Sequence, residues 1–254
     1  MRGNDEKGFC AAVQLFFNAG RLCRAARRDQ PPRANRRIPR TTGRSNPSSS
    51  FHSGQMAFDP ASVKRELRKS IIAKRDALSG EIRAALSVAI TNKIIGLDAY
   101  GKAAVVLAYM NFGSEFETEN FVKQVLEDGK ALLLPKLRKD RSGLDLHLVT
   151  DLEDGLESGV WGIREPRGGD SIEDFSLIDF ILVPGVAFSV DGARLGYGGG
   201  FYDRLLVDKR IDAASMAAAF SLQMVDEIPL EGNDIPVDGV ITEKGEYFRN
   251  GTIS

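Results

Sequence analysis

Cysteine is scarce in this sequence, and long apolar runs are missing. The 254 residues include two cysteines, Cys10 and Cys23, and both precede Met56. The chain from Met56 onward therefore has no disulfide framework and no thiolate metal site, which suits a reducing compartment. No apolar run is long enough to cross a bilayer, so the sequence predicts a protein that does not span a membrane.

The sequence also lacks a general excess of positive charge. Its net charge is -1, but residues 1–55 carry eleven basic and three acidic side chains, a charge of +8. The remaining residues carry 23 basic and 32 acidic side chains, a charge of −9. Surfaces that bind nucleic acids need clustered lysine and arginine, so the acidic body argues against a nucleic acid partner.

Residues 1–55 form a basic leader that we predict to be disordered. It is rich in arginine, proline and serine toward its end and has almost no periodic apolar face there, so burial cannot offset its ordering entropy. One interpretation is a mitochondrial or plastid transit peptide, because the leader is poor in acids. The other is an upstream extension without a function. Met56 directly precedes a helix start, which favours a functional body of residues 56–254 and a cytoplasmic protein.

The body alternates helical and extended patterns. Residues 62–78 have apolar positions at helical spacing, and either Ser62 or Asp59 can cap the start of this helix. Further helices are predicted over 81–97, 118–128 and 200–207. Apolar runs and alternating patterns predict strands over 102–109, 131–135, 144–149, 178–185, 215–220 and 238–242. This order predicts a single α/β domain with an open, largely parallel sheet covered by helices, a Rossmann-like three-layer fold.

Four glycines lie within five positions of the segment RLGYGGGFYDRLL, residues 194–206. The dinucleotide pattern G-x-G-x-x-G fails because position 201 is Phe, and the chain contains no Walker string G-x-x-x-x-G-K-[ST]. The segment nevertheless suits an anion, since glycines let backbone N–H groups approach closely and a helix start follows. Arg194 adds a planar donor for phosphate oxygens. The alternative is a plain tight turn.

The surroundings of the glycines favour a ligand site. The loop follows the predicted strand 178–185, and open α/β sheets bind ligands at the carboxyl ends of strands. Asp203 lies one turn into the next helix, where a carboxylate near phosphates calls for a cation such as Mg²⁺. Asp203 would also stabilise its own helix start. Asp234 and Asp238 form a second acid cluster, in a stretch that turn chemistry alone explains.

The segment 183–206 resembles the signature of the 5-formyltetrahydrofolate cyclo-ligase family, also called 5,10-methenyltetrahydrofolate synthetase. Other segments similar to family segments, in the family's order, are KRELR (64–68), AYMNFGSEFET (108–118), LLLPK (132–136), GIREP (162–166) and NDIPVDGVITEKG (233–245). The resemblance covers nearly all of residues 60–245 and none of the leader. It implies an enzyme that uses ATP and Mg²⁺ to convert 5-formyltetrahydrofolate into 5,10-methenyltetrahydrofolate, releasing ADP and phosphate.

The resemblance also implies roles for individual residues. Lys64 and Arg68, four positions apart on one helix, match ATP contacts of the family, whereas the helix alone favours a solvated basic face. The remaining residues of the implied ATP site are Arg194, Leu195, Gly196, Tyr197, Gly198, Gly199, Gly200, Phe201 and Tyr202. Asp203 and Asp234 match the Mg²⁺ positions, and carboxylate oxygens suit that ion.

Residues implied to contact the folate are Phe112, Glu117, Tyr197, Gly198, Gly199, Gly200 and Phe201. Glu117 matches a carboxylate that binds the N–H groups of the pterin, although it would also suit a helix N-terminus. Trp161 is predicted to line the pocket or the core. Some family members carry a basic residue in the loop where this chain has Tyr197 and Gly199, so Arg194 and the N-terminal helix supply the positive charge here.

Three functions are consistent with these residues. The first is the ATP-dependent cyclo-ligase, the second a non-catalytic folate- or nucleotide-binding relative, and the third another α/β enzyme that acts on a sugar phosphate. The presence of the metal acids Asp203 and Asp234 favours the enzyme, because a binding module need not keep them. The partners indicated are small molecules, and we predict a monomer.

Overall fold

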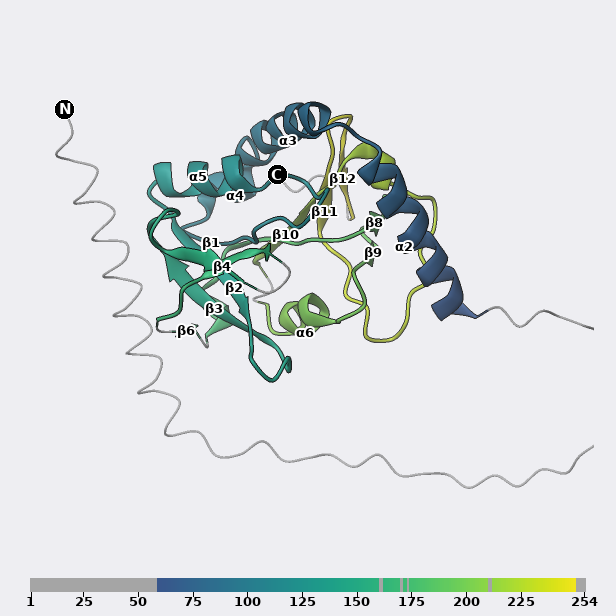
Figure 1. Ribbon diagram of the computed structural model, residues 1–254. Helices are drawn as coiled ribbons and strands as arrows, with labels where there is room; N and C mark the ends of the chain where they lie inside the picture. Colours follow the sequence, from purple (N-terminus) through teal and green to yellow (C-terminus); the bar gives the residue numbers. More distant parts are fainter. Residues whose placement is uncertain (1–58, 160–161, 170, 173, 210–211, 250–254) are drawn as a thin grey trace, which may run out of the picture.

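A computed structural model describes residues 59–159, 162–169, 171–172, 174–209 and 212–249 (Figure 1). The predicted leader with both cysteines, and Trp161, lie outside the described residues. Among the helices that are described, none combines the length and the apolar character needed to cross a membrane.

An eight-stranded mixed sheet forms the centre of the molecule. Its strands lie in the order β12-β11-β10-β7-β1-β2-β3-β6. Their bounds are β1 Val105–Leu107, β2 Ala131–Leu137, β3 Leu144–Val149, β6 Ser171–Ile172, β7 Phe180–Leu182, β10 Ala214–Ala218, β11 Gly239–Ile241 and β12 Glu246–Phe248. The strands from β11 to β2 pair in parallel, whereas β12, β3 and β6 pair antiparallel at the two sides. The predicted open sheet with a parallel centre is confirmed.

Helices cover both faces of this sheet, so the fold has three layers (Figure 1). One face carries α3 Gly80–Ile95, α4 Asp98–Lys102 and α5 Glu119–Glu127, and the other carries α6 Phe201–Val207 and the 3-10 helix η2 Phe175–Leu177. Neighbouring residues of a strand point to opposite faces. In β1, Val106 packs in the apolar cluster under α3 to α5, and Leu107 packs in the cluster under α6.

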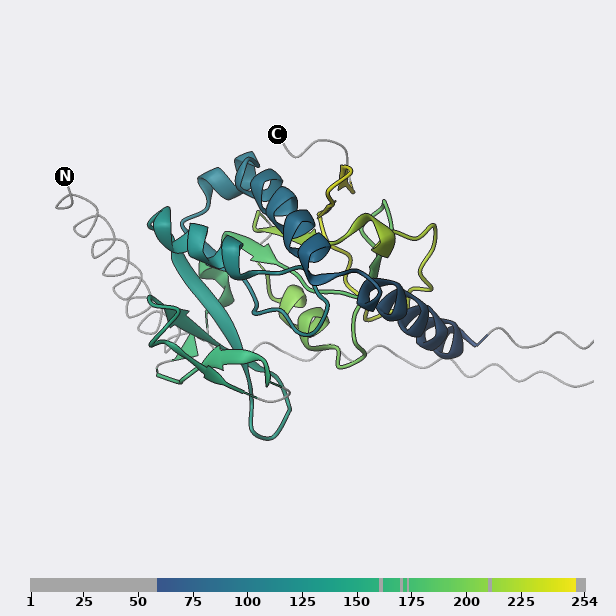
Figure 2. The same cartoon turned by 45° about the horizontal axis from the view of Figure 1, so that its top comes forward.

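The first helix, α2 Pro60–Asp76, lies apart from these layers. Figures 1 and 2 show it on the side of the molecule away from α5. Asp59 accepts hydrogen bonds from two backbone N–H groups of the first turn, so Asp59 and not Ser62 is the N-cap. Ile71 is buried in a third apolar cluster together with Leu195. The helix is therefore held against the segment that precedes the glycine loop.

The predicted strand over 102–109 is shorter than expected. Its first residue belongs to α4, which is one helical turn closed by a hydrogen bond from the Gly101 N–H to the Leu97 carbonyl. Only Val105–Leu107 form β1, and all three are buried between the two apolar clusters. The apolar run thus predicted the strand, but it did not indicate the residue at which the preceding helical turn ends.

The predicted strand over 178–185 also differs from the structure. It contributes β7 and is then followed by an antiparallel hairpin of β8 Ala187–Phe188 and β9 Arg194–Leu195. The turn of the hairpin includes Gly192 at a φ of +84°, a conformation that favours glycine. The glycine loop therefore follows β7 only after this hairpin, which the sequence analysis did not predict.

Candidate active site

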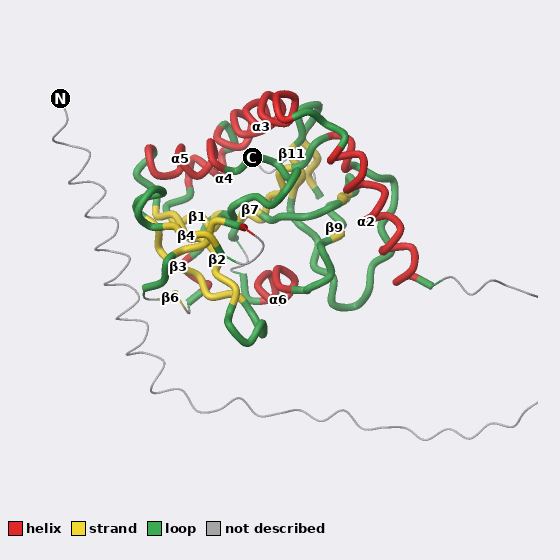
Figure 3. The backbone as a smooth tube through the Cα atoms, viewed as in Figure 1, coloured by secondary structure: helices red, strands yellow, loops and turns green. Residues whose placement is uncertain are grey.

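The glycine loop joins the hairpin to helix α6, and its backbone needs glycine. Gly198 has a φ of +100° and Gly200 a φ of +64°, and residues with a Cβ rarely adopt such values. Gly200 is the N-cap of α6, so the predicted helix start behind the glycines is confirmed. Figure 3 shows this loop running into α6 below the sheet.

The loop borders a cavity of about 620 Å³, a size typical of small-molecule sites. Other parts of its wall come from α2, from the segment behind β1, from β2 and β3, and from the turn before β11. The strand β5 Arg164–Pro166, which pairs with β4 Leu156–Ser158, also contributes to the wall. The predicted site residues that line it are Lys64, Arg68, Phe112, Arg194, Leu195, Gly196, Tyr197, Gly198, Gly199, Gly200, Phe201, Tyr202, Asp203 and Asp234. The structure thus brings together residues that are far apart in sequence, but Glu117 is not among them.

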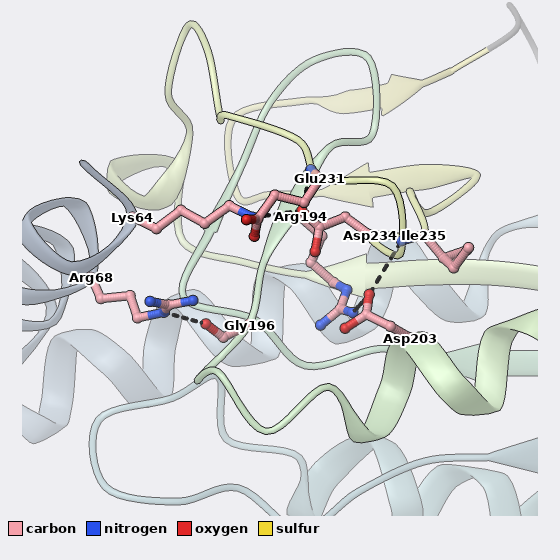
Figure 4. Close-up of polar contacts among 8 residues, drawn as sticks. All are labelled: Lys64, Arg68, Arg194, Gly196, Asp203, Glu231, Asp234 and Ile235. Atoms are coloured by element: carbon pink, nitrogen blue, oxygen red, sulfur yellow. Dashed lines mark hydrogen bonds and ion pairs between the residues drawn. The ribbon is translucent and has the colours of Figure 1, made fainter. Parts of the chain in front are cut away.

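Each of the two predicted metal acids is paired with a basic side chain (Figure 4). Arg194 Nη2 donates to Asp203 Oδ1 over 2.6 Å. Lys64 Nζ donates to Asp234 Oδ2 over 2.6 Å and to Glu231 Oε2 over 2.8 Å. Lys64 and Arg194 therefore compensate the charges of these acids.

Both basic side chains in these pairs are almost fully buried, with exposed fractions of 7% for Lys64 and 4% for Arg194. Burial alone would lower the pKa of the Lys64 ammonium, but its bonds to Asp234 and Glu231 raise it. Burial would likewise raise the pKa of Asp234, and the bond from Lys64 lowers it. The pair is therefore ionised at neutral pH, and removing Asp234 would leave the buried Lys64 ammonium with the more exposed Glu231 as its charged partner.

The two acids suit Mg²⁺ as partial ligands. In their hydrogen bonds to described residues, Asp203 uses only Oδ1 and Asp234 uses only Oδ2. The described part of the chain contains no group of three or more His, Cys, Asp and Glu side chains placed to hold a metal. Because Mg²⁺ usually combines one or two carboxylates with waters and substrate phosphates, two acids fit an ion that binds together with a nucleotide.

Gly198→Ala is expected to destabilise the protein by about 1–3 kcal/mol, because φ of +100° strains any residue with a Cβ. The nearest side-chain atoms to that Cβ, those of Arg68, would be 3.9 Å away, so the cost is strain and not a clash. Gly101→Ala is the matched control, since an added Cβ in α4 meets nothing within 4 Å. Thermal unfolding compares the two variants, and equal melting temperatures would contradict this loop conformation.

Of the two neighbouring acids Glu115 and Glu117, it is Glu115 that lines the cavity. Glu115 is 5% exposed and accepts hydrogen bonds from the Tyr197 hydroxyl over 2.6 Å and from the Phe112 N–H over 2.7 Å. The N–H of Glu117 donates to Ser87 Oγ of α3 over 3.0 Å. The two acids lie in an irregular segment without periodicity, so nothing in the sequence indicates which one faces the cavity.

Burial perturbs the titration of Glu115 and of the tyrosines around it. It raises the pKa of the Glu115 carboxyl above its ordinary value, although the bonds from Tyr197 and from a backbone N–H oppose this. Tyr109 and Tyr202 also line the cavity, and burial raises the pKa of both hydroxyls. The acid is therefore buried beside aromatic side chains, where a hydrogen bond to a ligand is stronger than in water.

The fold and the cavity define the class of this protein, an α/β protein with a small-molecule site bordered by a glycine loop. Residues 60–243 match the model of the 5-formyltetrahydrofolate cyclo-ligase family. The chain belongs to this family, whose members are ligases of folate one-carbon metabolism. The resemblance inferred from the sequence segments is confirmed.

Individual relatives agree with this assignment. The chain is 31% identical over 191 residues to the 5-formyltetrahydrofolate cyclo-ligase of Mus musculus, covering 72% of this chain and 94% of that protein. It is 33% identical over 184 residues to the enzyme of that name from Mycolicibacterium smegmatis, covering 71% and 94%. The solved structure of Aquifex aeolicus 5,10-methenyltetrahydrofolate synthetase superposes with a TM-score of 0.66 at 35% identity, covering 76% of this chain and 95% of that one.

Proposed function

We propose that the protein converts 5-formyltetrahydrofolate into 5,10-methenyltetrahydrofolate with ATP and Mg²⁺, releasing ADP and phosphate. The observation that carries this proposal is one cavity that combines a glycine loop, several basic side chains and the buried carboxylate of Glu115. Lys64, Arg68 and Arg194 suit a polyphosphate. Glu115 suits a pterin, whose N–H groups are good donors to a carboxylate. Membership of the family supports the same reaction.

The chemistry requires activation of an amide-like oxygen, which is a poor leaving group. In the proposed course, the formyl oxygen takes the γ-phosphoryl group of ATP, and ADP leaves. N10 of the folate then attacks the formyl carbon and loses its proton, the carbon–oxygen bond breaks, and phosphate leaves with that oxygen. The protein contributes positioning and charge stabilisation, as is usual in phosphoryl transfer.

The ion pairs of the cavity determine how charge is redistributed when the nucleotide binds. Arg194 and Lys64 now compensate Asp203 and Asp234. When bound, Mg²⁺ supplies positive charge to the acids and to the phosphates. Arg194 and Lys64 are then available to donate to phosphate oxygens. Nucleotide and metal together satisfy every charge, whereas either one alone leaves a buried charge uncompensated.

The purified full chain, supplied with 5-formyltetrahydrofolate, ATP and Mg²⁺, is expected to form the methenyl product, measured by its near-ultraviolet absorbance. The band should require all three additions, so omission of each one is the control. No band, with folate still raising the melting temperature, would instead identify a non-catalytic folate-binding relative. Absence of both band and binding would overturn the proposal.

A further inference from the structure

A chain of hydrogen bonds runs from helix α2 through the glycine loop to the acid in the cavity. Arg75, in the last turn of α2, donates from Nη2 to the Tyr197 hydroxyl over 2.9 Å. That hydroxyl donates to Glu115 Oε1 over 2.6 Å. The tyrosine hydroxyl therefore bridges a cation on α2 and the anion that we assign to the folate.

The chemistry of the three groups fixes the direction of these bonds. A guanidinium can only donate and an ionised carboxylate can only accept, so the single hydroxyl proton of Tyr197 points to Glu115. Each bond involves a charged group, and the two bonds polarise one another. The other oxygen of Glu115 accepts from the Phe112 N–H over 2.7 Å. Both carboxylate oxygens are thus held in place.

Arg75 brings a positive charge near the site but does not line the cavity where a ligand would bind. It is 3% exposed and is not among the residues that line the cavity. Its Nη1 has no hydrogen-bond partner among the described residues, and its Nε donates to the Ser114 hydroxyl over 3.0 Å. That hydroxyl donates to Asp76. The buried guanidinium thus reaches two carboxylates, each through one hydroxyl group.

The titratable groups that face Glu115 come from four parts of the fold. They are Arg75 of α2, Tyr197 of the glycine loop, Tyr202 of α6 and Tyr109 behind β1. Arg75 is the one of these four that is charged at neutral pH. Burial raises the pKa of Glu115, and the hydroxyl of Tyr197 and the charge of Arg75 lower it. Loss of the hydroxyl therefore moves this pKa upward.

We propose that Tyr197 is a positioning residue, whose hydroxyl holds the Glu115 carboxylate in place for the N–H groups of the folate and links it to the charge of Arg75. This inference rests on the proposed function, in which Glu115 binds the substrate. It gives Tyr197 a role that acts through Glu115, in addition to the contacts with nucleotide and folate predicted from the sequence. It also explains why a buried arginine outside the cavity wall is part of the site.

The test measures binding of 5-formyltetrahydrofolate to the full chain by calorimetry without ATP, between about pH 5.5 and pH 8.5. Tyr197→Phe keeps the ring and removes the hydroxyl. Folate binding weakens as the pH falls and Glu115 takes up a proton, and in the variant this midpoint is expected to lie about one pH unit higher. Affinity should therefore fall about tenfold at the acidic end and much less at the alkaline end.

Tyr100→Phe is the matched control. The Tyr100 hydroxyl donates to Asp128 Oδ2 over 2.6 Å, a bond of the same kind outside the cavity wall. Its loss is expected to leave the pH profile of folate binding unchanged. A wild-type profile for Tyr197→Phe, or an equal shift for Tyr100→Phe, would overturn the inference. If Tyr197→Phe does not fold, Arg75→Gln is tested in the same way, since it should move the pH midpoint of folate binding in the same direction.

Glu115→Gln separates a failure of this inference from a failure of the proposed site. Unchanged folate affinity in Glu115→Gln would remove Glu115 from the folate site and the positioning role with it. Weakened binding in Glu115→Gln, with an unshifted midpoint in Tyr197→Phe, would contradict the positioning role alone. The double variant of Tyr197→Phe and Arg75→Gln should shift the midpoint somewhat further than Tyr197→Phe does, because the charge of Arg75 also acts on Glu115 directly.

Discussion

Asp203→Asn is expected to lower turnover about hundredfold while changing folate affinity less than about threefold. Asparagine keeps the size of the side chain and an oxygen that can still accept from Arg194 Nη2 and from the Ile235 N–H. The local structure is therefore retained. What is lost is one of the two negative charges that we assign to Mg²⁺. Steady-state kinetics and folate titrations of the same preparation measure both effects.

The same variant is expected to bind metal-free ATP about tenfold more tightly than the wild type. The reason is that the buried Arg194 loses the charge that compensates it and is left to attract phosphate. Titrations with ATP in a chelator and in Mg²⁺ measure this difference. The ATP affinity of the wild type should depend strongly on Mg²⁺, and that of the variant much less. A general loss of structure cannot produce this pattern.

Asp238→Asn provides the matched control for Asp203→Asn. Asp238 accepts from Lys209 Nζ over 2.7 Å and from the Ser215 hydroxyl over 2.7 Å, and it does not line the cavity. Its replacement also removes a carboxylate from an ion pair, so stability should fall while turnover is maintained. Wild-type turnover in Asp203→Asn would remove Asp203 from the metal site.

Glu115→Gln is expected to raise the dissociation constant of 5-formyltetrahydrofolate between about tenfold and hundredfold. The amide keeps the shape of the side chain, but it replaces one acceptor with a donor that faces the N–H groups of the pterin. Turnover at saturating folate should change less than the KM, because Glu115 is assigned to binding and not to phosphoryl transfer.

Glu117→Gln is the control that the sequence itself supplies. Glu117 lies two positions away but outside the cavity wall, so its replacement should leave folate affinity at the wild-type value. The opposite outcome, with a large effect at Glu117 and none at Glu115, would restore the assignment made from the sequence. Melting temperatures of both variants show whether a change in affinity reflects binding or folding.

Local signals predicted the fold well. The buried runs that became β1, β2 and β7 and the periodic helices were enough to indicate a covered sheet with a parallel centre. The short strands β8 and β9 were missed because two-residue strands carry no periodicity, although the Asp191-Gly192 pair is a typical hairpin turn. The order of the strands depends on tertiary packing and is not contained in any one segment.

The candidate site was only partly predictable. The glycines and charged residues that line the cavity lie in segments that resemble family segments, and this resemblance identified them from the sequence. The choice between Glu115 and Glu117, or between Asp234 and Asp238, depends on how irregular segments turn, and that is set by distant contacts such as the one between Lys64 and Asp234. The bridge from Arg75 through Tyr197 joins positions 122 apart in sequence, and no local pattern encodes it.

Helix α2 carries Lys64, Arg68 and Arg75, yet its buried Ile71 belongs to a small apolar cluster. The central sheet, in contrast, lies between two much larger apolar clusters. Amide hydrogens of α2 should therefore exchange through a local opening that leaves the sheet folded, and this opening withdraws three positive charges from the site at once. A ligand that bridges α2 and the glycine loop binds only the closed form, so it raises the free energy of that opening. Ligand affinity and the exchange protection of the N-terminal helix consequently change together.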